Sequence, residues 1–402
     1  MAYSYDVMVA GHLCLDIIPQ FLSRPAKSIQ DVLVPGKLLL SGPCKFSSGG
    51  PVSNTGIGLK TLGLKVCFCA RVGGDDLGMM TRKILAQGGN IKGLNMAGAE
   101  SSSYTIVLAP AGIDRIFLHH PGSNDQFCVD DIPVALLKQC RHFHFGYPPI
   151  MQRMFADAGD ELQMIFKQAK ESGVVTSCDM ALPDPDSPAG KAPWMEILEK
   201  VLPFVDLFLP SLEETLFMLD PGRFAELKKK HGGEDLIFHM QLDDYARLAD
   251  MLLGMGAKMV GLKAGERGFY LKTATQPLPE SIYPLPLRDM GSWRKRELFC
   301  PAFMAPQVAS ATGSGDASIA GFLAAFYRGY PPEKCLKYAC LVGWQNVQHL
   351  DAISGFQSWE ATHQLLEQNL PFHTLSWETH DWTWNKSMQL WAGPQDRLHG
   401  RD

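Results

Sequence analysis

The segment SATGSGDASIAGF, residues 310–322, places three small residues directly before an aspartate and a helix-forming run. From Asp316 onward, apolar residues recur at helical spacing, at Ile319, Phe322, Leu323 and Phe326. This spacing predicts an amphipathic helix with Asp316 in its first turn.

The small residues before this helix predict an anion site. Glycines let the backbone approach a bound group, and first-turn amides have no acceptor inside their helix. Gly313, Ser314 and Gly315 therefore suit a phosphate group. A carboxylate repels a resident phosphate, but it suits a phosphoryl group in transit, because Asp316 can take the proton of an attacking hydroxyl. The alternative is that Asp316 only caps the helix.

Two familiar glycine motifs do not fit this segment. A Walker loop requires a lysine after its glycines, and none follows Gly315. A dinucleotide fingerprint opens the first βα unit of a chain, whereas this segment begins near residue 310. A dehydrogenase is therefore disfavoured.

A second glycine cluster lies near the N-terminus, in SSGGPVSNTGIGLKTLG at residues 47–63, with RVGGDDLG following at 71–78. These residues and the earlier GHLCLD offer groups that accept and donate hydrogen bonds, as a polyol requires. The candidates are Asp16, Gly49, Gly50 and Asn54. Taken alone, Asp16 could end a strand and Asn54 could cap a helix.

The remaining pattern predicts an α/β fold, because short strand-like runs alternate with helical ones. Strands are expected at residues 6–10, 65–70, 142–145, 174–178, 207–209 and 259–262, and helices at 52–62, 161–172 and 243–255. Residues 12–48 and 101–120 show the alternating residue pattern of β-strands, with a turn at 110–112. They predict a small accessory β-sheet.

Three segments interrupt this rhythm. Residues 224–238 and 273–298 are interpreted as insertions, and the second, rich in proline and charge, is expected at the surface. The end of the chain carries four tryptophans, Trp377, Trp382, Trp384 and Trp391. Such a segment is expected to pack against its own subunit or a neighbour.

Composition excludes several functional classes. The chain has 402 residues, 46% hydrophobic and 20% charged, and its apolar runs are too short to span a bilayer. No basic region precedes an apolar core at the N-terminus, so we expect no secretory signal and a cytoplasmic location. A net charge of −5 with dispersed basic residues argues against a nucleic-acid partner.

The spacing of the ten cysteines does not suggest disulfide pairs, and we expect them to be reduced. Cys140, His142 and His144 alternate along one predicted strand and could imitate a metal site. We favour a polar strand face, because no further cluster completes a tetrahedral set.

Together, the motifs resemble the ribokinase-like carbohydrate kinases, the PfkB family. The resemblance rests on Asp16, GGPVSN, GGDDLG, PSLEE at 210–214, KAGERG at 263–268 and ATGSGDASIAGF, and covers Tyr5 to about Leu366. It implies a ribokinase-like αβα sandwich with a mainly parallel sheet. The kinase domain would span 1–370, with lid strands within 12–48 and 101–120, and a Trp-rich extension would occupy 371–402.

The resemblance also implies ATP, Mg²⁺ and a sugar as ligands. Asp316 would be the catalytic base, and the amides of Gly313, Ser314 and Gly315 the anion hole. The sugar would contact Asp16, Gly49, Gly50 and Asn54. Glu214 would arrange Mg²⁺ and phosphates, while Lys263, Gly265 and Gly268 would lie along the nucleotide.

Several positions depart from the family pattern. Ser310 stands where many relatives have an aspartate, so the use of a monovalent cation stays open. Ser211 replaces a usual asparagine. Asp179 resembles an acidic residue of sugar-acid kinases, but the basic residue expected after it is absent unless Lys191 replaces it. Arg115, His119 and His120 are either substrate readers or exposed strand positions.

The favoured function is an ATP-dependent kinase of a free monosaccharide or sugar acid. A nucleoside kinase on the same fold is an alternative, and it would need an aromatic or apolar wall for the base. A sugar- or nucleotide-binding regulatory protein without catalysis is a second alternative, against which the intact Gly313, Gly315 and Asp316 argue. A homodimer is expected.

Overall fold

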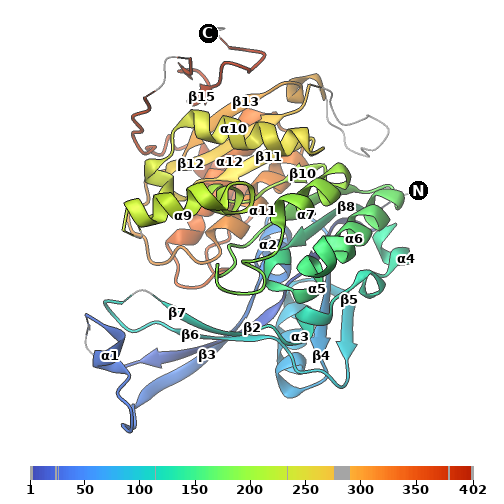
Figure 1. The fold of residues 1–402 in the computed structure, drawn as a ribbon, viewed down its shortest axis with the longest axis vertical. Coiled ribbons are helices and arrows are strands. Elements are labelled where there is room, and N and C mark those ends of the chain that lie inside the picture. The colour runs from blue at the N-terminus through green and yellow to red at the C-terminus, as the bar shows by residue number, and fades with distance from the viewer. Residues whose placement is uncertain are drawn as a thin grey trace.

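The computed structural model describes residues 3–22, 25, 27–113, 115–232, 234–275, 290–378 and 381–399. The described strands form one large sheet and one separate four-stranded sheet (Figure 1). Helices cover the large sheet, whereas the small sheet stands out from one side of this body.

The large sheet is mainly parallel, as predicted. Its order is β14-β15-β13-β12-β11-β10-β9-β8-β1-β4-β5, and pairing is parallel from β11 to β5 and antiparallel from β11 to β14. The parallel strands are β1 (Tyr5–Gly11), β4 (Val66–Gly73), β5 (Asn90–Ala97), β8 (Cys140–Gly146), β9 (Val175–Asp179), β10 (Leu207–Phe208) and β11 (Met259–Lys263). The antiparallel edge contains β12 (Gly268–Thr273), β13 (Glu297–Pro301), β14 (Thr383–Asn385) and β15 (Leu390–Ala392). Each of the six strands expected from the sequence is present, with ends shifted by three residues or fewer.

Helices pack on both faces of this sheet and bury two separate apolar cores. One face carries α2 (Pro51–Thr61), α3 (Asp76–Gly88), α11 (Ser314–Phe326), α12 (Pro332–Val347) and α13 (Trp359–Leu366). The other carries α4 (Val134–Leu137), α5 (Gln152–Phe155), α6 (Asp160–Glu171), α7 (Trp194–Val201), α8 (Leu212–Leu219), α9 (Pro221–Lys230) and α10 (Leu242–Gly254). The αβα architecture predicted from the sequence is confirmed, and α2, α6 and α10 each begin one residue before the predicted helix.

The helix α11 differs from its predicted character. It was expected to be amphipathic, but every residue from Ile319 to Phe326 is buried. The helix lies against both α2 and α12, which cover the sides that solvent would otherwise reach. A Cβ at Gly321 would lie 2.5 Å from the Tyr338 carbonyl oxygen, so a glycine permits this close approach.

The small sheet has the order β3-β2-β6-β7 and comprises β2 (Cys14–Phe21), β3 (Ser41–Gly49), β6 (Tyr104–Leu108) and β7 (Ile116–His120). The short helix α1 (Ile29–Val32) lies between β2 and β3. These strands lie in the two intervals, 12–48 and 101–120, in which an accessory sheet was expected. Only β3 extends past its interval, by one residue, to Gly49. β6 and β7 pair as an antiparallel hairpin.

The expected surface excursion at 273–298 is wrong at both ends. Thr273 is the last residue of β12, and Glu297 and Leu298 are buried in β13. Between them, Arg296 is buried and bonds Asp396 at 2.9 Å. Residues 276–289 lie outside the described residues.

The Trp-rich segment packs on its own chain. β15 extends the large sheet by pairing with β13, and Trp377 packs edge-on against Phe299. All ten cysteines are free thiols. Among the described helices, none combines the length and the apolar character needed to cross a membrane.

Candidate active site

The candidate site lies where several parallel strands end. β9 ends at Asp179 and β11 at Lys263, while His12 and Tyr147 directly follow β1 and β8. In open α/β sheets, the carboxyl ends of the strands form the edge at which ligands bind. The loops that precede α2 and α11 reach the same edge, because Asn54 of α2 bonds Asp316 of α11.

Asp316 lies at the centre of this arrangement and is only 1% exposed. Its Oδ2 accepts hydrogen bonds from Asn54 Nδ2 and from the Tyr147 hydroxyl, both at 2.9 Å, and its Oδ1 accepts one from Thr55 Oγ1 at 3.2 Å. Burial raises the pKa of Asp316, although these hydrogen bonds and the charge of Lys263 oppose the rise. The residue predicted as a base is thus bonded directly to Asn54, a residue predicted to bind substrate.

Tyr147 is a site residue that the sequence analysis missed. Its backbone is left-handed, with φ of 64°, which is uncommon for a residue other than glycine. This conformation directs the chain away from β8, and the Tyr147 hydroxyl reaches the Asp316 carboxylate. The signal available in the sequence was a tyrosine between the end of a strand and two prolines.

The predicted anion loop is shaped by its glycines. Gly313 has φ of 74°, and a Cβ there would lie 2.9 Å from the Ala352 Cα. A Cβ at Gly315 would lie 3.4 Å from Lys263 Cε and 3.7 Å from its Nζ. The N–H of Ser314 donates to the Ala311 carbonyl at 3.2 Å. The Ser314 amide, predicted as part of the anion hole, is thus already occupied, and the amides of Gly313 and Gly315 remain for an anion, with the Lys263 ammonium beside them.

Lys263 forms a buried ion pair with Asp179. Burial lowers the pKa of Lys263, but the carboxylates of Asp179 and Glu214 outweigh this effect and raise it. Burial also raises the pKa of Asp179, whose Oδ2 is buried without a hydrogen-bond partner. Lys191, considered as the cation for Asp179, is exposed, and Lys263 fills that role.

Glu214 stands in the first turn of α8, close enough to Lys263 to influence its charge. Its carboxylate accepts the Ser211 N–H at 2.6 Å, and Ser211 Oγ accepts the Glu214 N–H at 3.2 Å. This reciprocal cap fixes the glutamate. Ser211 also forms a β-bridge with Lys263, which ties α8 to the end of β11.

Gly265 and Gly268 shape the turn that follows Lys263. Both have positive φ, 50° and 130°. A Cβ at Gly268 would collide with the Cys300 carbonyl oxygen, and one at Gly265 would lie 3.1 Å from the Ile237 side chain. A side chain at either position would therefore disturb the turn.

The residues predicted to bind substrate lie on the other side of Asp316. A Cβ at Gly49 would lie 2.5 Å from Asp16 Oδ2, and a Cβ at Gly50 would lie 2.6 Å from His12 Nδ1. Burial raises the pKa of Asp16 to about 6. His12 Nδ1 and Asn54 Oδ1 are buried and have no hydrogen-bond partner, so polar atoms here are available to a ligand.

Besides Asp16 on β2, the small sheet and its β6–β7 loop approach the site through three further side chains. His119 Nε2 lies 3.4 Å from His12 Nε2, and Lys45 Nζ lies 2.6 Å from Asp351 Oδ2. Arg115 donates to Ser310 Oγ at 2.6 Å and to Thr312 Oγ1, directly before the anion loop. His120 instead bonds Ser101 at 3.2 Å.

Cys140, His142 and His144, considered as a metal site, are all buried in β8. His142 bonds the Tyr327 hydroxyl at 2.7 Å and Ser177 Oγ at 2.6 Å, and His144 bonds the same Ser177 oxygen at 2.7 Å. Protein hydroxyls thus occupy both ring nitrogens of His142 and the Nδ1 of His144, whereas His144 Nε2 is buried without a partner; the shared Ser177 hydroxyl favours the structural interpretation.

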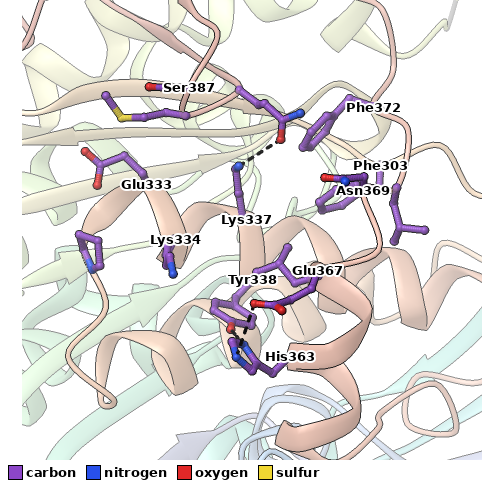
Figure 2. A pocket seen from close by; sticks show the side chains of 15 residues that line it. Phe303, Glu333, Lys334, Lys337, Tyr338, His363, Glu367, Asn369, Phe372 and Ser387 are labelled. Carbon is purple, nitrogen blue, oxygen red and sulfur yellow. Dashed lines mark hydrogen bonds and ion pairs between the residues drawn. The ribbon is translucent and has the colours of Figure 1, made fainter. Parts of the chain in front are cut away.

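A pocket of about 570 Å³ lies elsewhere, between α12, α13 and the C-terminal segment (Figure 2). Lys334, Lys337, Tyr338 and His363 help to line it, and no predicted site residue does. Tyr338 lies against Gly321, whereas Gly343, farther along α12, lies against Ser314. The residues that line the pocket include none of α11, and the pocket residue Tyr338 meets α11 at Gly321 rather than at the turn that holds Asp316.

Comparison with known proteins agrees with this geometry. The model of the pfkB family carbohydrate kinases matches residues 10–359. An uncharacterized sugar kinase of Archaeoglobus fulgidus is 21% identical over 74% of this chain and 98% of its own. Arabidopsis thaliana ribokinase, solved with ribose and ATP, superposes with a TM-score of 0.66 at 18% identity, over 91% of this chain and 99% of that one. An E. coli protein described as ribokinase II, solved with ATP and Mg²⁺, gives 0.65 at 18% identity, over 91% and 100%. The chain belongs to the pfkB family of carbohydrate kinases, phosphotransferases with a hydroxyl group as acceptor.

Proposed function

We propose that the protein transfers the γ-phosphoryl group of ATP to a hydroxyl of a free monosaccharide or sugar acid. The observation that carries this proposal is the buried Asp316 carboxylate at the start of α11, bonded to Asn54 on one side and adjacent to the glycine loop on the other. A base between a polyol site and an anion site suits phosphoryl transfer to an alcohol.

Each group then has a distinct task. Asp316 orients the acceptor hydroxyl and takes its proton late, as a loose phosphoryl transfer requires. The amides of Gly313 and Gly315 and the Lys263 ammonium stabilise negative charge on the transferring group. Asp16, Asn54 and His12 hold the other hydroxyls of the substrate.

The carboxylates near Lys263 fit a hard divalent cation such as Mg²⁺. Asp179 Oδ2 is buried without a partner, and the Glu214 carboxylate is close enough to shift the pKa of both Asp179 and Lys263. Oxygen ligands of this kind, with phosphate oxygens and water, are those that Mg²⁺ prefers. When bound, Mg²⁺ neutralises phosphate charge, while Glu214 and Asp179 would hold it or its water ligands.

The walls of the substrate side favour a sugar over a nucleoside. His12, His119 and Tyr147 form an aromatic group, with ring centroids 5.1 Å apart for His12 and His119 and 6.3 Å apart for His12 and Tyr147. This wall presents an unpartnered imidazole nitrogen and a hydroxyl that bonds Asp316, rather than an apolar face. Such groups match hydroxyls better than the flat face of a base.

The small sheet is proposed to act as a lid. Its contacts through Lys45, Arg115 and His119 reach loops on both sides of Asp316. A lid excludes water from the phosphoryl group and prevents wasteful hydrolysis of ATP.

The test is ADP release with ATP, Mg²⁺ and a panel of hexoses, pentoses, sugar acids, polyols and nucleosides. We expect turnover with a sugar or sugar acid, and a fall of kcat by about 10³-fold in Asp316→Asn with little change in sugar affinity, because only the base is lost. Asp160→Asn, on the surface of α6, is the matched control. Unchanged turnover in Asp316→Asn would exclude its role as base, and release of ADP only with nucleosides would reassign the substrate.

A further inference from the structure

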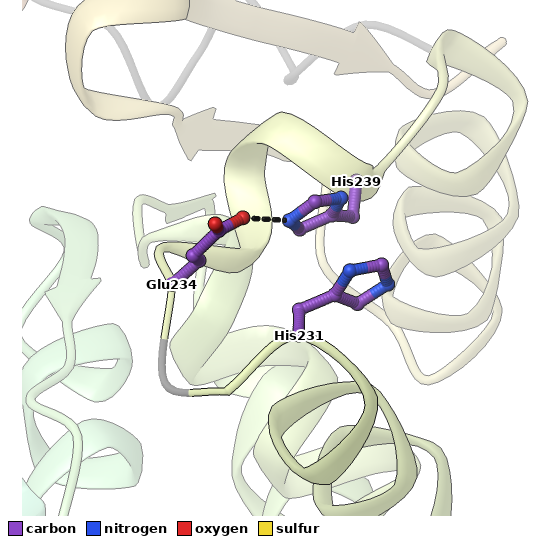
Figure 3. Close-up of side chains that lie close together, drawn as sticks. All are labelled: His231, Glu234 and His239. Atoms are coloured by element: carbon purple, nitrogen blue, oxygen red, sulfur yellow. Dashed lines mark hydrogen bonds and ion pairs between the residues drawn. The ribbon is translucent and has the colours of Figure 1, made fainter.

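A second group of potential ligands lies outside the candidate active site. Figure 3 shows His231 at the end of α9, Glu234 in the following turn and His239 at the end of the 3₁₀ helix at Leu236–His239. Of the residues that the structure describes, these three alone form a group of His, Cys, Asp or Glu side chains with metal-ligating proximity. One ligand atom from each lies within 4.8 Å of the other two.

The side chains already converge without an ion. His239 Nε2 lies 2.9 Å from Glu234 Oε2, and the rings of His231 and His239 stack with centroids 3.4 Å apart and planes inclined by 15°. Zinc bonds to nitrogen and oxygen of about 2.0–2.2 Å place tetrahedral ligand atoms about 3.4 Å apart. Because the two rings are stacked nearly parallel, one imidazole must turn out of the stack before both ring nitrogens point at one ion, and its partly exposed position permits this turn.

We propose that His231, Glu234 and His239 bind one divalent transition-metal ion of the Zn²⁺ class, with water completing the coordination. Two imidazoles and one carboxylate suit a borderline ion such as Zn²⁺, Ni²⁺ or Co²⁺, whereas Mg²⁺ prefers oxygen ligands alone. The site is therefore distinct in chemistry from the carboxylates near Lys263. It does not depend on the proposed function.

The backbone that carries the ligands is anchored on both sides. Glu213 Oε1 accepts the Leu236 N–H at 2.7 Å. The same oxygen forms an ion pair with Lys228 at 3.1 Å, so the charge of this lysine near the site is neutralised. Arg267 donates to the Ile237 and Met240 carbonyl oxygens at 2.7 and 3.0 Å. A bound ion would join the end of α9 to a turn that already packs on the 265–267 turn, next to the proposed nucleotide site.

Titration of the full-length protein with Zn²⁺, in the presence of excess Mg²⁺, tests the proposal. We expect one equivalent of Zn²⁺ to bind, and His231→Ala or His239→Ala to weaken this binding by about tenfold or more, as does Glu234→Gln. His349→Ala, an exposed histidine on another surface, is the matched control. Equal Zn²⁺ binding by the wild type and all variants would overturn the site.

Further measurements identify the ligands of the bound ion and check that the variants are folded. Co²⁺ bound by histidine and carboxylate gives no thiolate charge-transfer band, so such a band would assign the ion to cysteines and overturn the proposal. Thermal unfolding with a chelator shows whether the variants fold as the wild type does. Slower hydrogen exchange at residues 234–240 on adding Zn²⁺, absent from His239→Ala, supports the site, and unchanged exchange in the wild type contradicts it.

Discussion

The large sheet and the small sheet bring charged groups to the site in different ways. Asp316, Asp179 and Lys263 come from the large sheet and α11, are buried, and bond to other groups of the site. The small sheet holds the partly buried Asp16 on β2, but Lys45 on β3 and Arg115 in the loop before β7 reach across to Asp351 and Ser310 as single long side chains. Lys45 is 59% exposed in its side chain, against 10% for Lys263.

This difference indicates that the two sets of groups have different roles, charge stabilisation for the buried groups and lid opening for the exposed ones. Buried groups with fixed partners are preorganised, so they can stabilise charge that develops during the reaction. Exposed pairs contribute little free energy and break easily, which suits a lid that must open for substrate and product. Changes in the large-sheet groups should therefore lower kcat, and changes in the small-sheet groups should raise KM.

Apart from Asp316→Asn, the largest effect is expected for Lys263→Met. It leaves Asp179 without its cation in a buried place, which should lower the free energy of unfolding by about 3 to 5 kcal/mol. It also removes the ammonium beside Gly315, so kcat should fall by about 10²-fold or more. Denaturant unfolding and steady-state kinetics measure the two effects.

The double variant Lys263→Met/Asp179→Asn separates these effects. Neutralising Asp179 removes the unpaired charge, so most of the stability should return while turnover stays low. Full recovery of turnover in the double variant would show that Lys263 acts only as a structural counterion, and the contrast between the two sheets would then lose its main support.

Asp16→Asn should come second, with opposite effects on stability and binding. The pKa of Asp16 is raised from 3.8 to about 6 in the folded protein, so stability is lost as pH rises through this interval. The neutral asparagine avoids this loss and should raise the free energy of unfolding at pH 7.5 by about 2 kcal/mol. The difference should shrink toward pH 4, where the wild-type carboxyl is protonated.

The same variant should raise KM for the sugar by about tenfold or more, because a charged acceptor of a hydroxyl is lost. Unfolding curves at pH 4.5, 6 and 7.5 and kinetics at pH 7.5 provide the measurements, with Asp160→Asn as an exposed control. A stability difference that does not vary with pH would contradict the raised pKa.

Tyr147→Phe should have an intermediate effect, a fall of kcat by about tenfold. The Tyr147 hydrogen bond lowers the pKa of Asp316, so its removal should move the acid limb of the kcat profile to higher pH. Tyr5→Phe is a matched control, because the Tyr5 hydroxyl bonds Asn90 far from Asp316, at the start of β1. A lower kcat with an unmoved acid limb would mean that Tyr147 positions substrate rather than Asp316.

The sequence was informative where a motif is local. The two glycine loops, Asp316 and the intervals of the small sheet were predicted because each depends on neighbours within about twenty residues. Tyr147 and the Asp179–Lys263 pair were missed, since they arise from contacts between strands that lie far apart in the chain. The burial of α11 was missed for the same reason, because α12 covers a face that the local pattern assigns to solvent.

The smallest effects are expected for Arg115→Ala and Lys45→Ala. Lys45→Ala removes the ion pair with Asp351, and Arg115→Ala removes the hydrogen bonds to Ser310 and Thr312, so KM for the sugar should rise by about fivefold at most while kcat changes less than about twofold. For Lys45→Ala the rise should diminish at high salt, because a partly exposed ion pair is screened. Arg82→Ala, an exposed residue of α3, is the matched control.

If Arg115→Ala instead lowered kcat by about 10²-fold with KM unchanged, the arginine would act on the transferring phosphoryl group. The small sheet would then contribute to the chemistry as well as to access, because Arg115 already lies against Ser310 and Thr312 at the mouth of the glycine loop.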